Sequence, residues 1–126
     1  MPDSAAPALA IVGNLNVDQW VRTVDRFPAW DEELLVDSAR LELAGTAGYI
    51  LQACRGLGLD AFVVSTIGDD VFGRFVLGCL RELEFDASGV EVLRGEETAV
   101  GMIFVGPAGR RGILSTTGAH ARMVVN

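Results

Sequence analysis

One short segment near the N-terminus limits the possible fold of this chain more than any other. It is an apolar run that ends in a glycine and is followed by an amide and a carboxylate. The run covers residues 9–12, and Gly13, Asn16 and Asp18 come after it. A short apolar run of this kind predicts a buried strand, and α/β folds bind ligands at the carboxyl ends of such strands. A carboxylate accepts hydrogen bonds from two neighbouring hydroxyl groups, and an amide both donates and accepts. The segment therefore predicts a site that suits a polyol better than a phosphate.

Apolar periodicity after this segment alternates between strand and helix. The predicted core strands cover 9–12, 61–67 and 90–93, the predicted helices 46–57 and 70–83, and the predicted hairpin strands 19–24 with 34–43 and 98–105 with 112–116. Asp69 and Asp70 stand where they can cap the second helix. This order predicts an α/β fold in which two hairpins project from a parallel core. If the hairpins pair into a small sheet, that sheet is placed to act as a lid over a ligand at Asp18.

The charge balance argues against several classes of partner. Seventeen acidic and ten basic residues give a net charge of −7, which opposes binding to nucleic acid or to an anionic membrane. No apolar stretch approaches the roughly 20 residues that span a bilayer. Residues 1–7 have no basic segment before an apolar one, so we expect no secretory signal and a cytoplasmic protein. Cys54, Cys79 and the lone His120 lack the spacing of a metal site, so the two cysteines are predicted core residues.

Several short motifs follow one another along the chain. They are Gly13 with Asn16 and Asp18, Phe27-Pro28 with Asp31-Glu32-Glu33, Ala44-Gly45 followed by Leu57-Gly58, Gly68-Asp69-Asp70 with Phe72-Gly73, and Thr98, Met102–Val105 and Gly118-Ala119. Each is weak alone, but their order resembles that of the ribokinase-like, PfkB-type carbohydrate kinases. The resemblance implies that residues 1–126 are the N-terminal part of a ribokinase-like domain. That part would be a partial three-layer α/β core with lid hairpins at about 18–43 and 98–116.

The resemblance also assigns substrate-binding roles to five residues. Asn16 and Asp18 would contact the sugar, and Gly45 would be either a hinge between lid and helix or only a helix-start glycine. Thr98 either points toward the sugar or begins a strand. Tyr49 stands where the family usually has an asparagine that contacts the sugar, so it either binds a different ligand or fills space. The sugar or nucleoside that would bind is therefore left open.

The activity that the resemblance implies is transfer of the ATP γ-phosphoryl group to a sugar or nucleoside hydroxyl, with Mg²⁺. In that family the catalytic base and the nucleotide pocket lie in a part that these 126 residues do not include. We therefore expect no catalytic residue and no ligand for ATP or Mg²⁺ in this chain, and no activity from the chain alone. The alternatives are a non-catalytic module for polyol binding or oligomerisation, and an inactive truncated remnant.

A homodimer is a further implication of the resemblance. Lid sheets in related kinases pair between subunits, and we expect such pairing here near Trp20, Val36 and Ile103.

Overall fold

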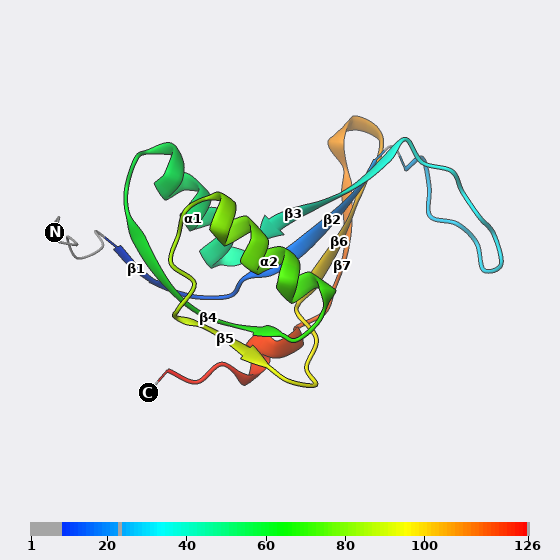
Figure 1. Ribbon diagram of the computed structural model, residues 1–126. Coiled ribbons are helices and arrows are strands. Elements are labelled where there is room, and N and C mark those ends of the chain that lie inside the picture. The colour runs from blue at the N-terminus through cyan, green and yellow to red at the C-terminus, as the bar shows by residue number, and fades with distance from the viewer. Residues whose placement is uncertain (1–8, 23, 126) are drawn as a thin grey trace, which may run out of the picture.

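The structure is a computed structural model that describes residues 9–22 and 24–125 (Figure 1). Its strands are β1 (Leu9–Val12), β2 (Asn16–Arg22), β3 (Ser38–Ala44), β4 (Ala61–Gly68), β5 (Val90–Leu93), β6 (Val100–Val105) and β7 (Arg111–Ser115). Its helices are α1 (Gly45–Gly56) and α2 (Val71–Glu82), with short 3₁₀ turns at Pro107–Gly109 and Gly118–Arg122. No helix of the described ranges is long and apolar enough to cross a bilayer.

A parallel three-stranded sheet in the order β1-β4-β5, which we call the core sheet, packs against both helices. Because side chains alternate along a strand, Val63 and Ile67 of β4 point to the same face, and both are fully buried. They join Leu51 of α1 with Val76 and Leu80 of α2 in one apolar cluster. Burial of these side chains drives the packing, at roughly 1.5–3 kcal/mol for each fully buried residue. The predicted α/β core is confirmed.

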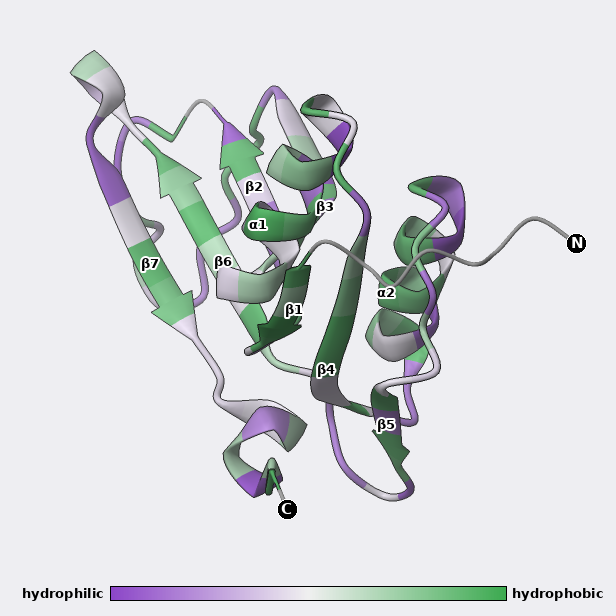
Figure 2. Ribbon diagram, turned by 90° about the vertical axis from the view of Figure 1, so that its left-hand side faces the viewer, coloured by the Kyte–Doolittle hydropathy of each residue, from purple (hydrophilic) through white to green (hydrophobic). Residues whose placement is uncertain are grey.

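A second sheet, which we call the outer sheet, has the order β3-β2-β6-β7. The β2–β3 and β6–β7 pairs are antiparallel hairpins, and β2 joins β6 in parallel. Figure 2 shows this sheet standing beside β1, β4 and β5. Val17 at the start of β2 and Leu43 near the end of β3 belong to the main apolar cluster, so the base of the outer sheet is packed on the core. The two predicted hairpins therefore form one small sheet.

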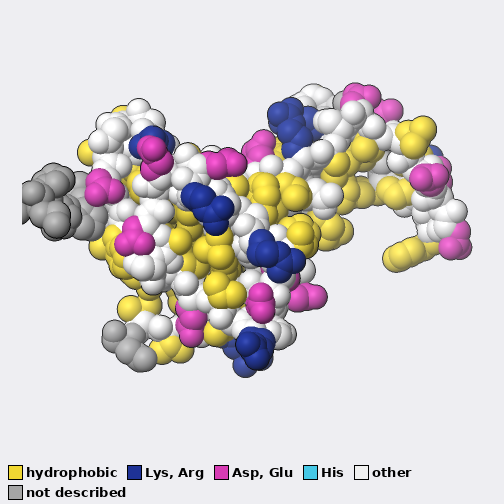
Figure 3. All heavy atoms as spheres, viewed as in Figure 1, with side chains coloured by type: hydrophobic (Ala, Val, Ile, Leu, Met, Phe, Trp, Pro, Cys, Tyr) yellow, Lys and Arg dark blue, Asp and Glu magenta, His cyan; other side chains and the backbone are white. Residues whose placement is uncertain are grey.

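Residues 24–37 differ from the prediction. The segment 34–37, with its apolar residues at 34–36, is not a strand, and β3 begins only at Ser38, while β2 begins at Asn16 instead of Gln19. Within the described residues, only Asp37 at the end of this segment bonds to β2, through its N–H to the Arg22 carbonyl at 2.9 Å, and the segment before it projects from the molecule (Figure 1). Figure 3 shows hydrophobic side chains on its surface, where Trp30 and Leu35 are 98% and 92% exposed.

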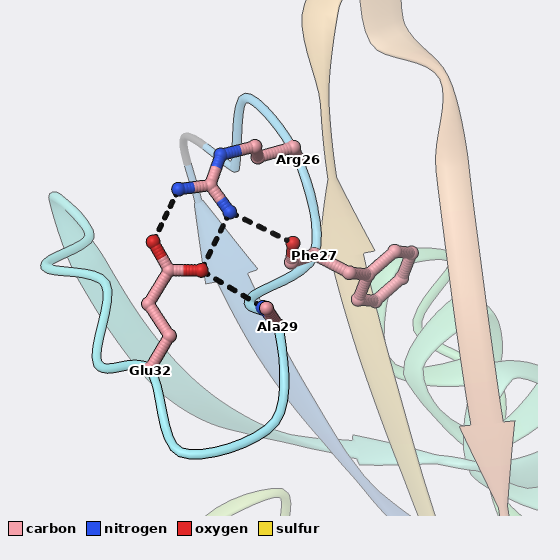
Figure 4. A network of polar contacts seen from close by, with 4 residues as sticks. All are labelled: Arg26, Phe27, Ala29 and Glu32. Atoms are coloured by element: carbon pink, nitrogen blue, oxygen red, sulfur yellow. Dashed lines mark hydrogen bonds and ion pairs between the residues drawn. The ribbon is translucent and has the colours of Figure 1, made fainter.

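A local polar network gives the projecting segment its turn. Arg26 pairs with Glu32, whose carboxylate also accepts a 2.8 Å hydrogen bond from the Ala29 N–H (Figure 4). Asp31 completes the turn with a φ of 63°, in the left-handed region that Asp tolerates better than most residues. A turn around Pro28 and Asp31 thus stands at the end of the projection. Residues 1–7, for which we expect no secretory signal, and Thr23 of the predicted first hairpin strand lie outside the described residues.

Candidate functional site

Asp18 lies on β2, an interior strand of the outer sheet, and is only 8% exposed. Its partners on the neighbouring strands are Glu42 of β3 and Gly101 of β6. A Cβ atom at position 101 would lie 2.6 Å from Oδ1 of Asp18 and 3.9 Å from Oγ of Ser115. Because real Cβ atoms do not approach so closely, any larger residue at position 101 would displace the carboxylate. Gly101 therefore positions Asp18.

Tyr49 reaches Asp18 from the first turns of α1. Its hydroxyl donates a 2.7 Å hydrogen bond to Oδ2 of Asp18, while its side chain is 53% exposed. Burial of the hydroxyl against the sheet, the hydrogen bond to Asp18 and the charges of Asp18 and Glu42 raise the pKa of Tyr49 to about 12. The phenol therefore stays protonated and acts as a donor to Asp18 at neutral pH. Oδ1 receives no hydrogen bond from the described residues, so it is left to accept one from a ligand.

A corner built on Asn14 connects β2 to the start of α1. The Asn14 side chain donates to Oδ1 of Asn16 at 3.0 Å and accepts from the Thr46 N–H at 3.3 Å, and its carbonyl accepts from the Ala47 N–H at 3.1 Å. The residue at the N-cap, Ala44, has no side-chain acceptor, so these bonds satisfy N–H groups at the start of the helix instead. Gly45 lies in the same corner with a φ of 84°, and a Cβ there would lie 2.4 Å from the Asn14 carbonyl oxygen. The glycine is therefore required by the corner.

Thr98 lies in a different polar cluster, at the start of α2. Its hydroxyl donates to Oδ1 of Asp70 at 2.7 Å and accepts from the Gly68 N–H at 3.0 Å. Asp70 also accepts from the N–H groups of Thr98 and Gly73, at 2.9 and 2.7 Å. Burial acts to raise the pKa of Asp70, but these hydrogen bonds outweigh it and hold that pKa below its usual range. Asp70 is therefore the helix cap.

The structure thus brings four of the five predicted site residues close together and separates one. Asp18 and Tyr49 touch, and Gly45 begins α1, the helix that carries Tyr49, directly after β3, which pairs with the strand that carries Asp18. Asn16 lies two positions before Asp18, on the same face of β2. The Thr98 hydroxyl is bonded within the Asp70 cap, and β6 begins only at Val100, so Thr98 does not begin the strand as predicted. Contact between Thr98 and a sugar stays a prediction. The predicted capping role also applies to Asp70 alone, because the Gly73 N–H bonds only that carboxylate.

Two further residues of the site were not predicted from the sequence. Asn14 follows Gly13 at a strand end, where an asparagine is a recurrent local hydrogen-bonding residue, so its position in the sequence is a signal that could have identified it. Gly101 gave no signal, because its requirement depends on the register that places it opposite Asp18. Within the described residues, no group of three or more His, Cys, Asp or Glu side chains could hold a metal ion.

Comparison with known proteins assigns a family to this architecture. Residues 6–125 match the pfkB family carbohydrate kinases. An ATP-dependent ribose-1-phosphate kinase from Halopiger xanaduensis is 32% identical over 108 residues, which are 86% of this chain and 36% of that protein. The chain thus spans about a third of the length of this relative.

Solved structures show the same fold. Ribokinase from Giardia lamblia superimposes with a TM-score of 0.79 at 25% identity, over 94% of this chain and 36% of that one. Ribokinase from Arabidopsis thaliana, complexed with ribose and ATP, gives a TM-score of 0.81 at 21% identity, over 91% and 37% of the two chains. A Burkholderia thailandensis nucleoside kinase in complex with inosine gives 0.73 at 28% identity, over 89% and 36%. With a family match over nearly its whole length and a ribokinase-like fold, this chain belongs to the pfkB family of carbohydrate kinases.

Proposed function

We propose that this chain forms the substrate-binding and lid part of an ATP-dependent kinase that phosphorylates a hydroxyl group of a sugar or nucleoside. The observation that carries the proposal is the pair formed by Asp18 and Tyr49. Their hydrogen bond of 2.7 Å leaves Oδ1 of Asp18 as an acceptor, and the Tyr49 oxygen keeps acceptor capacity of its own. Two adjacent acceptors fit two neighbouring hydroxyl groups of a ribose-like ring. A charged acceptor strengthens such hydrogen bonds.

The outer sheet is the proposed lid. It is joined to α1 through Gly45, whose φ of 84° is open to glycine and costly for other residues. Rotation of the sheet at this corner would carry Asp18 and a bound sugar toward the core sheet. Closure of that kind excludes water, which otherwise competes with the sugar hydroxyl for the phosphoryl group.

The catalytic base and the nucleotide site are assigned to no residue of this chain. The carboxylate of Asp70 is occupied by the helix cap, and that of Asp18 is bound by Tyr49. ATP and Mg²⁺ are implied for a family member of full length. The described residues offer no metal-binding cluster, so we assign no role in binding ATP or Mg²⁺ to this chain. We propose that the 126-residue chain binds substrate and does not catalyse transfer by itself.

The substrate classes that follow from the relatives are a ribose phosphate, a free ribose and a ribonucleoside. These share a ribosyl ring with neighbouring hydroxyl groups, which matches the acceptors at Asp18 and Tyr49.

Thermal unfolding of the purified chain with ribose, inosine and ribose 1-phosphate tests the proposal. Ligand binding to the folded state raises the melting temperature. We expect a rise with at least one of the three ligands that Asp18→Asn abolishes. Asp69→Asn is the matched control, because Asp69 is exposed and its side chain makes no hydrogen bond with the described residues. A rise that survives Asp18→Asn would contradict the proposed site.

The outer sheet is also the proposed surface for a homodimer. The predicted contact lies near Trp20, Val36 and Ile103. Ile103 itself is buried within the chain, whereas Val36 is exposed, and Ile113 and Leu114 on the edge strand β7 are more than half exposed. Exposed apolar side chains on an edge strand favour pairing with another strand. Sedimentation equilibrium of the wild-type chain and of Leu114→Glu tests this. A monomer at all concentrations for the wild type would contradict it.

A further inference from the structure

The face of the outer sheet that carries Asp18 has a basic end. Alternation along β2 puts Trp20 and Arg22 on the same face as Asp18. The register continues this face across the sheet, because Arg22 is opposite Val105 and Val105 is opposite Arg111. Arg40 of β3 is opposite Trp20. Three arginines thus stand on one face beyond the carboxylate.

Contacts on both faces support this placement. The guanidinium of Arg22 lies over the Trp20 ring, with 5.6 Å between its central carbon and the ring centroid. On the opposite face, Phe27 packs edge-to-face on Phe104, and a Cβ on Gly112 would lie 2.8 Å from Phe27. Phe104 directly precedes Val105, and Gly112 directly follows Arg111. Because neighbouring residues on a strand point to opposite faces, Val105 and Arg111 point to the Asp18 face.

Arg22, Arg40 and Arg111 are exposed, and none of them forms an ion pair with another of the described residues. The ion pairs within the described residues use Arg26, Arg55 and Arg122 instead. The charge of Arg111 acts to lower the pKa of Tyr49, against the larger effects of burial and Asp18, so this guanidinium lies within electrostatic reach of the site. A positive charge that is close to a ligand site and unpaired is available to an anion.

The dimensions suit a small ligand with two different ends. Asp18 and Arg22 are four positions apart on one strand, which corresponds to about 13 Å between their Cα atoms. The Arg22 guanidinium lies over the ring of Trp20, the residue between Asp18 and Arg22 on this face of the strand. Hydroxyl groups at one end would meet Asp18 and Tyr49, and an anionic group at the other end would meet Arg22 and Arg111.

We propose, on the basis of the function proposed above, that the sugar bound at Asp18 carries a phosphate group and that Arg111, with Arg22, binds this phosphate. Arginine presents a planar fork of N–H donors that matches phosphate oxygens in a bidentate way. A neutral ribose or nucleoside would leave these guanidinium groups unused. Arg111 is therefore the residue that selects a sugar phosphate over the neutral sugar.

Calorimetric titration of the full chain with ribose, ribose 1-phosphate, inorganic phosphate and ATP tests this proposal. We expect ribose 1-phosphate to bind at least about tenfold more tightly than ribose, as a charge-assisted hydrogen-bond pair implies. Arg111→Gln should remove this preference and leave ribose binding unchanged. Arg111→Lys should restore only part of it, because lysine keeps the charge and loses the fork. Arg110→Gln is the matched control, since Arg110 is exposed and precedes β7.

Four other results of these titrations would contradict the proposed phosphate site. Equal affinity of the wild type for ribose and ribose 1-phosphate overturns the inference and leaves the proposed function standing. An equal loss of both ligands in Arg111→Gln also overturns it, because Arg111 would then act on the fold or on Asp18. Inorganic phosphate or ATP binding as tightly as ribose 1-phosphate, independently of Asp18, shows a general anion site and overturns it as well. Absence of binding by every ligand overturns the inference together with the proposed function of this chain.

Discussion

The hydroxyl of Tyr49 donates a 2.7 Å hydrogen bond to Oδ2 of Asp18, although 31 positions separate the two residues in sequence. One residue belongs to the outer sheet and the other to the first helix against the core. The bond therefore ties the proposed lid to the body of the molecule at the point where a sugar would bind. It also links the protonation of Tyr49 to the geometry of Asp18.

The first prediction concerns the ionisation of Tyr49. The sequence contains one tyrosine, so the ultraviolet difference absorption of tyrosinate reports this residue alone. We expect a titration midpoint near the raised pKa of about 12, well above the ordinary value of about 10. Because the unfolded chain ionises at the lower pKa and the folded chain at the higher one, stability should be constant below about pH 10 and fall above it. The pH dependence of denaturant midpoints measures this.

Asp18→Asn gives the control for that titration. Removal of the charge and of the carboxylate acceptor should bring the midpoint of Tyr49 closer to its ordinary value. A midpoint that is the same in both chains would show that Asp18 has no part in holding the proton.

The second prediction separates the position of Asp18 from the stability of the fold. Gly101→Ala places a Cβ 2.6 Å from Oδ1 of Asp18, which is the free end of a side chain and can move. We expect the melting temperature to change little. Alanine is more favourable than glycine in a strand interior by roughly 0.5–1 kcal/mol, which offsets the cost of moving the Asp18 carboxylate. The Tyr49 titration should shift toward its ordinary pKa, and ligand-dependent stabilisation should be lost.

Gly78→Ala is the matched control for Gly101→Ala. Gly78 lies within α2, and a Cβ there would meet no atom within 4 Å. This variant should gain roughly 0.5–1 kcal/mol of stability and keep both the Tyr49 titration and ligand binding. A similar loss of binding in both variants would contradict the assignment of Gly101.

Much of the fold could be predicted because local pattern and tertiary structure agree. The predicted strand at 90–93 is observed as β5 with the same bounds, and the helix predicted over 70–83 is observed as Val71–Glu82. In the helix, the apolar residues that set the period are also residues that pack on the core, and in β5 Val90 does so. The hairpin strand predicted over 34–43 is observed only from Ser38, for the converse reason. The apolar residues at 34–36 resemble a strand but pair with no strand of the described residues, and Leu35 is almost fully exposed.

Candidate site residues could be proposed from the sequence only where the type of residue itself indicates the chemistry. A carboxylate after a strand-end glycine predicts Asp18 as a site residue, but the effect of Gly101 on its position depends on cross-strand register, which local pattern does not contain. Thr98 shows the opposite case. The sequence left its hydroxyl available for a sugar, whereas the fold brings it to Asp70, 28 positions away, where it completes the helix cap.

The third prediction concerns that cap. Asp70→Ala removes the acceptor for the N–H groups of Gly73 and Thr98, and Thr98 is buried. We expect a loss of about 1 kcal/mol for the cap and about 1–3 kcal/mol for the buried donor left unpaired, measured by denaturant unfolding at neutral pH. Asp69→Ala should stay within about 0.5 kcal/mol of the wild type. Equal losses in the two variants would contradict the cap assignment.

The same carboxylate gives a pH dependence with a defined sign. The pKa of Asp70 is lower in the folded chain than its ordinary value of about 3.9. Its stabilising contribution is therefore complete above that ordinary value and is lost as the pH falls through the lower folded pKa. We expect the wild type to lose its advantage over Asp70→Ala only below about pH 4, as measured by unfolding midpoints along a pH series. A difference between the two chains that does not change in this acid range would contradict the lowered pKa.

The fourth prediction tests whether the corner at Gly45 is required by backbone geometry alone or also by close packing. Gly45 and Gly58 both have a φ in the left-handed region, at 84° and 69°. Alanine at either position should cost about 1–2 kcal/mol for that conformation. Only at Gly45 would the new Cβ also meet a backbone atom, the Asn14 carbonyl oxygen at 2.4 Å, whereas Gly58 has open space. Gly45→Ala should therefore be less stable than Gly58→Ala by a further 1–3 kcal/mol or so, the usual cost of overpacking.

Because the Asn14 carbonyl accepts from the Ala47 N–H, hydrogen exchange at Ala47 should accelerate in Gly45→Ala and not in Gly58→Ala. Equal stability of the two variants would mean that the corner relaxes freely, and a hinge that depends on close packing between Gly45 and Asn14 would then be wrong.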